Sequence, residues 1–209
     1  MADDLIRKLE IGFDAQRSGN AAKAEQMYKQ VLDAEAGNKH ALNLLGALCV
    51  NSNRPREAVD FLTKAIVADP QEAQAHANIG LAFKDLGQAV AAARHLLEAT
   101  RLNQQNPMVF NNLGNVLREL DQPKKAIQAY DKALRIDPNF SECWSNLASA
   151  FKDTGEYETG LKAIDKALEL EPDLAQAFSN RGDIRLQQGR FEEALDDYQT
   201  AIRINPNFT

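Results

Sequence analysis

The sequence predicts an all-α fold, an α-solenoid built from six similar helix-turn-helix units. Three observations predict it. A pattern of aromatic, small and proline residues returns every 34 residues, apolar residues within each copy follow a helical period, and glycine or proline stands where each helix has to end. The copies follow one another without insertion: 5–38, 39–72, 73–106, 107–140, 141–174 and 175–208. We therefore expect a single domain over residues 1–209, cut at a repeat boundary from a longer protein.

The repeat is clearest in residues 107–140. This copy holds an aromatic residue, a Leu-Gly pair and then further small, aromatic and proline residues: Phe110, Leu113, Gly114, Ala126, Tyr130, Ala133 and Pro138. The next two copies keep this order, beginning with Trp144 and Phe178 and ending with Pro172 and Pro206. One copy of such a pattern is weak evidence, but several copies in phase indicate a repeat architecture.

Each repeat contains two amphipathic helices. Apolar or small residues at positions 4, 7, 8 and 11 share one face of a first helix, A, and those at 20, 21, 24, 27, 28 and 30 share one face of a second, B. Position 8 is glycine in every repeat except the fifth, which has Ala148. Glycine inside a helix costs roughly 1 kcal/mol relative to alanine. Its recurrence therefore indicates that helices A and B cross closely.

Residues that tolerate left-handed backbone or break helices separate the two helices. Helix A is expected to stop at Gly19, Gly87, Gly155 and Gly189, with Asn53 and Asp121 in the equivalent places. Helix B is expected to stop before Pro70, Pro138, Pro172 and Pro206.

Composition excludes several classes of protein. The 24 basic and 30 acidic residues give a net charge of −6, which opposes non-specific binding to nucleic acid or anionic lipid. No run approaches the ~18 apolar residues of a membrane span, and the first residues do not resemble a signal peptide. Cys49 and Cys143 form no disulfide framework. We expect a cytoplasmic protein that binds no nucleic acid and does not insert into membranes.

The sequence contains no recognisable catalytic or cofactor motif. His40, His76 and His95 fall at unrelated repeat positions, and no phosphate-binding loop, dinucleotide fingerprint or zinc-protease motif is present. His76 takes the aromatic position of its repeat, so we expect a core imidazole. The sequence thus predicts no catalytic residue, no metal site and no cofactor.

The aromatic, Leu-Gly, alanine and proline positions resemble the tetratricopeptide repeat. The resemblance implies a right-handed superhelix whose helices A line a concave face, and that face usually holds the ligand. Helical spacing places positions 2, 5, 6, 9, 12 and 13 on the stripe opposite the packed face.

Asparagine dominates this stripe. Position 6 is Asn78, Asn112, Asn146 and Asn180 in four consecutive repeats, and Asn111 and Asn115 lie beside it in the fourth. A primary amide offers a donor and an acceptor together, so each asparagine can pair with a peptide N–H and C=O. The ladder resembles the superhelix of O-linked N-acetylglucosamine transferases and bacterial tetratricopeptide proteins. An equally open interpretation is that these asparagines brace neighbouring helices.

Charged and apolar residues complete the expected inner face. Position 12 is basic in repeats 3 to 5 (Lys84, Arg118 and Lys152), and position 13 is acidic. These stripes either orient a charged peptide or bridge neighbouring repeats. Apolar residues occupy the N-terminal end: Ile6, Leu9, Phe13 and Leu44. They predict an apolar partner contact or self-association, unless the degenerate first helix rotates to bury them.

Three functions remain open. The first is a non-catalytic scaffold that binds an extended peptide or partner segment on helices A. The second is the substrate-recruiting arm of a larger enzyme such as a glycosyltransferase. The third is self-assembly through the terminal repeats, because no polar capping helix follows the last one and Leu195, Tyr198 and Ile202 are expected to be partly uncovered.

Overall fold

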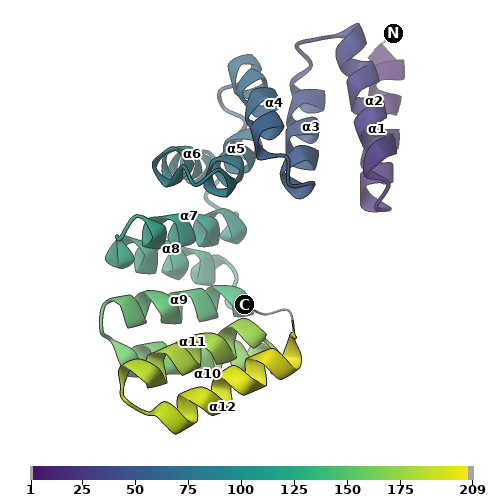
Figure 1. The fold of residues 1–209 in the computed structure, drawn as a ribbon. Coiled ribbons are helices and arrows are strands. Elements are labelled where there is room, and N and C mark those ends of the chain that lie inside the picture. Colours follow the sequence, from purple (N-terminus) through teal and green to yellow (C-terminus); the bar gives the residue numbers. More distant parts are fainter. Residues whose placement is uncertain (1, 207–209) are drawn as a thin grey trace. The chain divides into compact units, whose positions relative to one another are not determined.

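The computed structural model describes residues 2–206, and within this range it contains twelve α-helices and no β-strand (Figure 1). Consecutive helices pair as hairpins, so the described residues form six helix-turn-helix units, as predicted. The chain divides into two compact units, unit 1 up to Gln104 and unit 2 from Gln105. The last two residues of the sixth predicted repeat lie outside the described range.

Unit 1 contains three hairpins. Their helices are α1 (Ala2–Arg17) and α2 (Ala21–Ala34), α3 (Lys39–Asn51) and α4 (Pro55–Ala68), and α5 (Ala73–Asp85) and α6 (Ala89–Leu102). Within the unit, α2 also packs against α3, and α4 packs against α5. A core cluster that joins the second and third hairpins shows the result, because Leu62 of α4 and Ile79 of α5 are buried in it together.

Unit 2 repeats this arrangement. Its helices are α7 (Pro107–Glu119) and α8 (Pro123–Ile136), α9 (Ser141–Asp153) and α10 (Tyr157–Leu170), and α11 (Ala175–Gln187) and α12 (Phe191–Ile204). Ile164 of α10 and Ile184 of α11 share one core cluster. A single hairpin is too small to bury its own apolar face, so neighbouring hairpins supply the core.

The predicted helix ends are confirmed. The second residue after helix A has a positive φ in every repeat, including the non-glycine residues Asn53 and Asp121, each with φ 55°. Asparagine and aspartate tolerate this left-handed conformation better than other residues with a side chain. Helices α4, α8, α10 and α12 each end two residues before the expected proline.

The small residue at position 8 lies directly against the side chain at position 24. A Cβ atom added to Gly114 would lie 2.4 Å from Cε1 of Tyr130, and one added to Gly46 would lie 2.3 Å from Cγ of Leu62. Tyr130 and Leu62 are both fully buried. The close crossing inferred from the sequence is therefore present, and the ring or branched chain below each glycine occupies the space that a methyl group would need.

We expect Gly114→Ala to lower the free energy of unfolding by about 1–3 kcal/mol, because overpacking against the Tyr130 ring outweighs the gain in helix propensity. Gly37→Ala is the matched control, since nothing lies within 4 Å of its added Cβ. Urea unfolding followed by circular dichroism measures both. Equal stability of the two variants would contradict the packing argument.

No helix within residues 2–206 has both the length and the apolar character that crossing a lipid bilayer requires.

Candidate functional site

Helices A lie next to one another within each unit. In unit 1, α3 contacts both α1 and α5, and in unit 2, α9 contacts both α7 and α11. The side chains at positions 5 and 6 therefore meet across neighbouring helices A. This geometry decides which of the predicted asparagines remain available to a ligand.

Three asparagines at position 6 hydrogen-bond to position 5 of the preceding repeat. Asn78 Nδ2 donates to Asn43 Oδ1 at 3.1 Å, and Asn146 Nδ2 donates to Asn111 Oδ1 at 3.1 Å. Asn180 Nδ2 donates to the Oγ of Ser145 at 2.8 Å. Bracing of neighbouring helices, one of the two interpretations open from the sequence, is thus present at three rungs of the ladder.

Asn78 and Asn180 also use their amide oxygens inside the protein. Gln74 Nε2 donates to Asn78 Oδ1 at 3.0 Å, and Gln176 Nε2 donates to Asn180 Oδ1 at 2.9 Å. Both glutamines occupy position 2, one helical turn before the asparagine. Because both asparagines are also buried, their hydrogen-bonding capacity serves the fold.

Asn112 is placed differently. It is half-buried, and among the described residues of unit 2 its side chain has no hydrogen-bond partner. One reason lies in the sequence: position 2 of its repeat is Met108, whereas glutamine at position 2 donates to the asparagine of the third and sixth repeats. A thioether has no hydrogen to donate. Within the described part of unit 2, Asn112 therefore keeps both its Nδ2 group and its Oδ1 atom unpaired.

Asn111 does not lie on the exposed stripe as expected, whereas Asn115 is half-buried like Asn112. Asn111 is buried and accepts the bond from Asn146, because position 5 faces the next helix A. Asn115 Oδ1 accepts a hydrogen bond from the Tyr130 hydroxyl at 2.7 Å. Asn115 keeps its Nδ2 donors, and Asn146 keeps its Oδ1 acceptor without a partner among the described residues of unit 2.

The basic stripe is neutralised in unit 2. Arg118 Nε lies 2.8 Å from a carboxylate oxygen of Asp153, and Lys152 Nζ lies 2.6 Å from one of Asp183. Each pair joins two adjacent repeats, which is the bridging alternative. Lys84 is half-buried and forms no ion pair with another described residue of unit 1. Such partly exposed pairs contribute little to stability, but they remove two free positive charges from this face.

The apolar residues of the first two repeats separate into two groups. Ile6 and Phe13 are exposed, at 55% and 49%. Leu9 and Leu44 are half-buried against a core cluster that contains Tyr28 and Leu45. Rotation of α1 does not bury Ile6 and Phe13, so an apolar patch remains on unit 1.

His76 is a core imidazole that replaces an aromatic side chain. Its Nε2 lies 3.2 Å from the carbonyl oxygen of Pro70, and in the fifth repeat Trp144 Nε1 donates to the equivalent carbonyl of Pro138 at 2.9 Å. The Nε2 nitrogen must carry the proton to make this bond, so Nδ1 accepts. His95 Nδ1, 3.2 Å away, is therefore the donor.

Burial, together with the neighbouring Arg94 guanidinium and His76, lowers the pKa of His95 to about 4. The ring also stacks on Phe83, with centroids 5.5 Å apart. Because the folded pKa lies below the unfolded value of 6.5, the unfolded chain binds a proton first as the pH falls. The neutral His95 ring therefore makes its full contribution to the free energy of unfolding above pH 6.5, and this contribution is lost as the pH falls towards 4.

We expect the free energy of unfolding to fall by about 1–2 kcal/mol between pH 7.5 and pH 5 through this ring. His95→Gln retains a donor towards His76 but cannot titrate, so its pH dependence should be weaker by that amount. Urea titrations of both proteins at the two pH values measure the difference. Parallel pH profiles would contradict the assignment.

Neither cysteine shows the features of a reactive thiol. Both are buried, and burial raises the pKa of Cys49 and raises that of Cys143 to about 12. The thiolate is the reactive form. Among residues 2–206, no group of three His, Cys, Asp or Glu side chains is arranged to hold a metal ion.

Sequence reasoning missed the partners that hold the ladder in place. Asn43, Ser145 and Gln176 carry these bonds. A signal was available, because position 2 is polar in the three repeats whose asparagine is bonded (Gln74, Glu142 and Gln176) and is Met108 in the repeat of Asn112.

Fold and inner face together define an α-solenoid repeat protein. Family models described as tetratricopeptide repeat match residues 15–80, 107–140, 129–162 and 175–208. The chain belongs to the tetratricopeptide repeat family.

Many known proteins are similar to it, among them two curated relatives and one solved structure. A probable UDP-N-acetylglucosamine–peptide N-acetylglucosaminyltransferase, SPINDLY, from Hordeum vulgare is 36% identical over 94 residues, 42% of this chain and 10% of that protein. A peroxisomal targeting signal receptor from Candida albicans is 34% identical over 82 residues, 39% of this chain and 14% of that protein. The crystal structure of MamA is 30% identical with a TM-score of 0.71, over 79% of this chain and 97% of that one. The matched segments span about a tenth and a seventh of the two curated relatives.

We expect Asn180→Ala to lower the free energy of unfolding by about 1–3 kcal/mol, because it leaves Ser145 and Gln176 without their partner. Asn112→Ala is the control and should change stability by less than about 0.5 kcal/mol. Thermal and urea unfolding of the two variants separate the roles. A large loss for Asn112→Ala would show that its side chain also serves the fold.

Proposed function

We propose that this chain is a non-catalytic protein-interaction scaffold that binds an extended peptide or partner segment on helices A. The binding face centres on Asn112 of α7 and continues to Asn146 of α9. The observation that carries the proposal is the contrast within the ladder. Asn78 and Asn180 use both ends of their amides internally, whereas Asn112 uses neither end within its unit.

The groups available on α7 and α9 suit the backbone of an extended segment. Asn112 offers a donor and an acceptor, Asn115 offers donors and Asn146 an acceptor. A primary amide pairs with a peptide N–H and C=O whatever the side chain. Since Arg118 and Lys152 are held by Asp153 and Asp183, neutral hydrogen bonds rather than charge select the ligand.

The relatives support a protein or peptide as the partner. The barley protein is named for acting on a peptide, and the Candida protein is named as a receptor for a targeting signal. Both match this chain through a segment of similar length, 94 and 82 residues.

We expect Asn112→Ala to weaken peptide binding about tenfold, as the loss of hydrogen bonds worth about 1–2 kcal/mol requires. Binders selected on the wild-type chain from a random twelve-residue peptide library provide the probes, and fluorescence anisotropy measures their Kd. Raising the salt concentration from 50 to 300 mM should change Kd less than threefold, because few ionic contacts form.

Lys64→Ala, on the exposed surface of α4, serves as the control and should bind like the wild type. An unchanged Kd for Asn112→Ala and for the Asn112→Ala/Asn146→Ala double variant would contradict the proposal that peptides bind on this face.

A second candidate is the substrate-recruiting arm of a larger glycosyltransferase, favoured by the 36% identity to the barley enzyme. The coding sequence that follows Thr209 decides this: a transferase domain in frame supports it, and a stop codon removes it.

Self-assembly is a third candidate, favoured by the exposed Ile6 and Phe13 on α1. Sedimentation velocity over a wide concentration range tests it, and a constant monomer mass removes it.

A further inference from the structure

The last hairpin, α11–α12, carries charged residues at three positions where the other hairpins are neutral and mostly apolar. Position 7 is Arg181 in the last repeat and Ile11, Leu45, Ile79, Leu113 and Leu147 in the others. Position 11 is Arg185 in the last repeat and Ala15, Cys49, Phe83, Leu117 and Phe151 in the others. Position 23 is Asp197 in the last repeat and Met27, Phe61, His95, Ala129 and Ala163 in the others. The change is confined to one repeat and affects all three positions together.

Positions 11 and 23 face the following hairpin inside each unit. In unit 1, Cys49 and Phe61 lie in the core cluster that holds Ala75 and Ile79 of α5. In unit 2, Ala163 of α10 lies in the cluster that contains Ile184 of α11. Arg185 and Asp197 therefore lie on the face of α11 and α12 on which a following hairpin would stack. We call these two residues, together with Arg181, which is bonded to Asp197, the end face.

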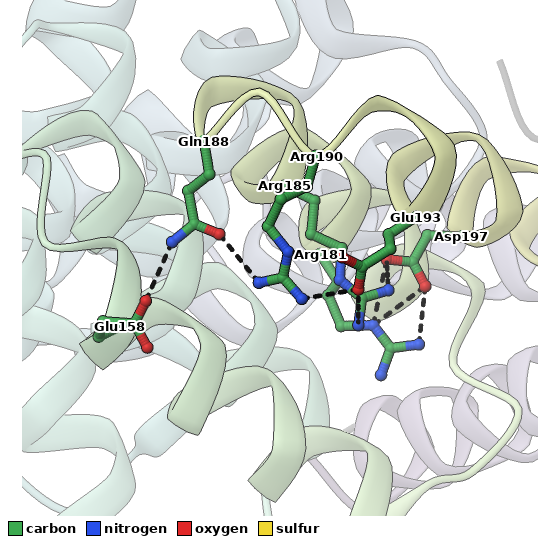
Figure 2. Close-up of polar contacts among 7 residues, drawn as sticks. All are labelled: Glu158, Arg181, Arg185, Gln188, Arg190, Glu193 and Asp197. Atoms are coloured by element: carbon green, nitrogen blue, oxygen red, sulfur yellow. Dashed lines mark hydrogen bonds and ion pairs between the residues drawn. The ribbon is translucent and has the colours of Figure 1, made fainter.

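The three charged residues of the end face are fixed to one another (Figure 2). Arg181 donates to Asp197 Oδ1 from Nε at 3.0 Å and from Nη2 at 2.7 Å. Arg185 Nη1 donates to Asp197 Oδ2 at 2.6 Å. Asp197 is only 1% exposed, so two guanidinium groups cover a buried carboxylate and form its stable environment.

Further polar contacts surround this centre. Arg190 and Glu193 form a two-bond ion pair with a shortest distance of 2.6 Å, and Glu193 also lies 3.6 Å from Arg185. Gln188 bonds to both Arg190 and Glu158 (Figure 2). The end face is thus the centre of a connected network in which three arginines balance three carboxylates, those of Asp197, Glu193 and Glu158.

The apolar rim of α12 shows that nothing in the described chain covers this face. Leu195 and Ile202 are 58% and 53% exposed. Their equivalents in the preceding repeat, Leu161 and Leu168, are half-buried and pack against the cluster shared with α11.

The first hairpin shows the mirror-image substitution. Inside each unit, positions 3 and 10 face the preceding hairpin and are buried and neutral: Ala41, Leu48, Ala75, Ala82, Cys143, Ala150, Ala177 and Ile184. In α1 they are Arg7 and Asp14, and both are exposed.

We infer that Arg181, Arg185 and Asp197 form a polar cap built into the last hairpin, which prevents a further apolar hairpin or a second copy of this chain from stacking there. Stacking would remove water from two guanidinium groups that offer more donors than Asp197 can accept. The Nε of Arg185 already has no partner among the described residues. The inference concerns this face and not the length of the chain.

Rebuilding the face with the residues of the fifth repeat tests the cap. In the variant Arg181→Leu/Arg185→Phe/Asp197→Ala, the apolar stacking surface returns, and self-association measured by sedimentation velocity should strengthen about tenfold or more over the wild type. The control Lys124→Leu/Lys125→Phe/Asp131→Ala makes the same change in charge and side chains on exposed positions of α8. It should associate like the wild type.

Equal self-association of the rebuilt variant, the control and the wild type would overturn the inference of a cap.

A second measurement leaves the end face intact and so does not depend on how the rebuilt variant folds. A copy of residues 141–174 is joined in phase after residue 208 of the wild-type chain. We expect trypsin to remove the added hairpin at least tenfold faster than it cuts the preceding repeats. Protection equal to that of the fifth repeat would show that an apolar hairpin stacks on the end face and would overturn the inference.

Discussion

The close crossing of the two helices in each hairpin is the contact on which the rest of the structure depends. It requires a residue almost without a side chain at position 8, because the Tyr130 ring or its equivalent fills the space below. The fifth repeat keeps the same crossing with Ala148 at position 8 and Gly160 at position 20. There an added Cβ would lie 3.2 Å from the Ala148 carbonyl oxygen. Small residues on either helix thus serve one steric requirement.

Stacking of hairpins then determines which polar side chains remain available. Position 5 of one helix A faces position 6 of the next, so a polar residue at position 5 engages the asparagine that follows it. Glutamine at position 2 adds a second bond in the third and sixth repeats, and Met108 takes that position beside Asn112. A ladder that looks uniform in sequence therefore braces neighbouring helices at Asn78, Asn146 and Asn180, while Asn112 has no hydrogen-bond partner among the described residues of unit 2.

The same logic applies at the end of the array. A position that is apolar in the inner repeats holds Asp197 in the last one, and its buried carboxylate is stable only because Arg181 and Arg185 also replace apolar residues. The three substitutions depend on one another, since any one of them alone would leave a charge unpaired under apolar neighbours. Unit 1 shows a related but neutral replacement, in which His76 and His95 take positions usually held by aromatic or apolar side chains and bond to each other.

The sequence by itself determined the helices, their pairing and most of the core. Periodic apolar residues, position-8 glycines and the left-handed residues Asn53 and Asp121 depend on local geometry, which is written in the order of residues along one hairpin. The sequence also identified the row of asparagines at position 6. Only the tertiary structure decided which of these asparagines hydrogen-bond within the protein. It also decided that Asn111 is buried and that Arg118 and Lys152 form ion pairs. Those outcomes depend on contacts between residues about 35 positions apart, where a single polar atom on the neighbouring helix decides whether an amide is satisfied.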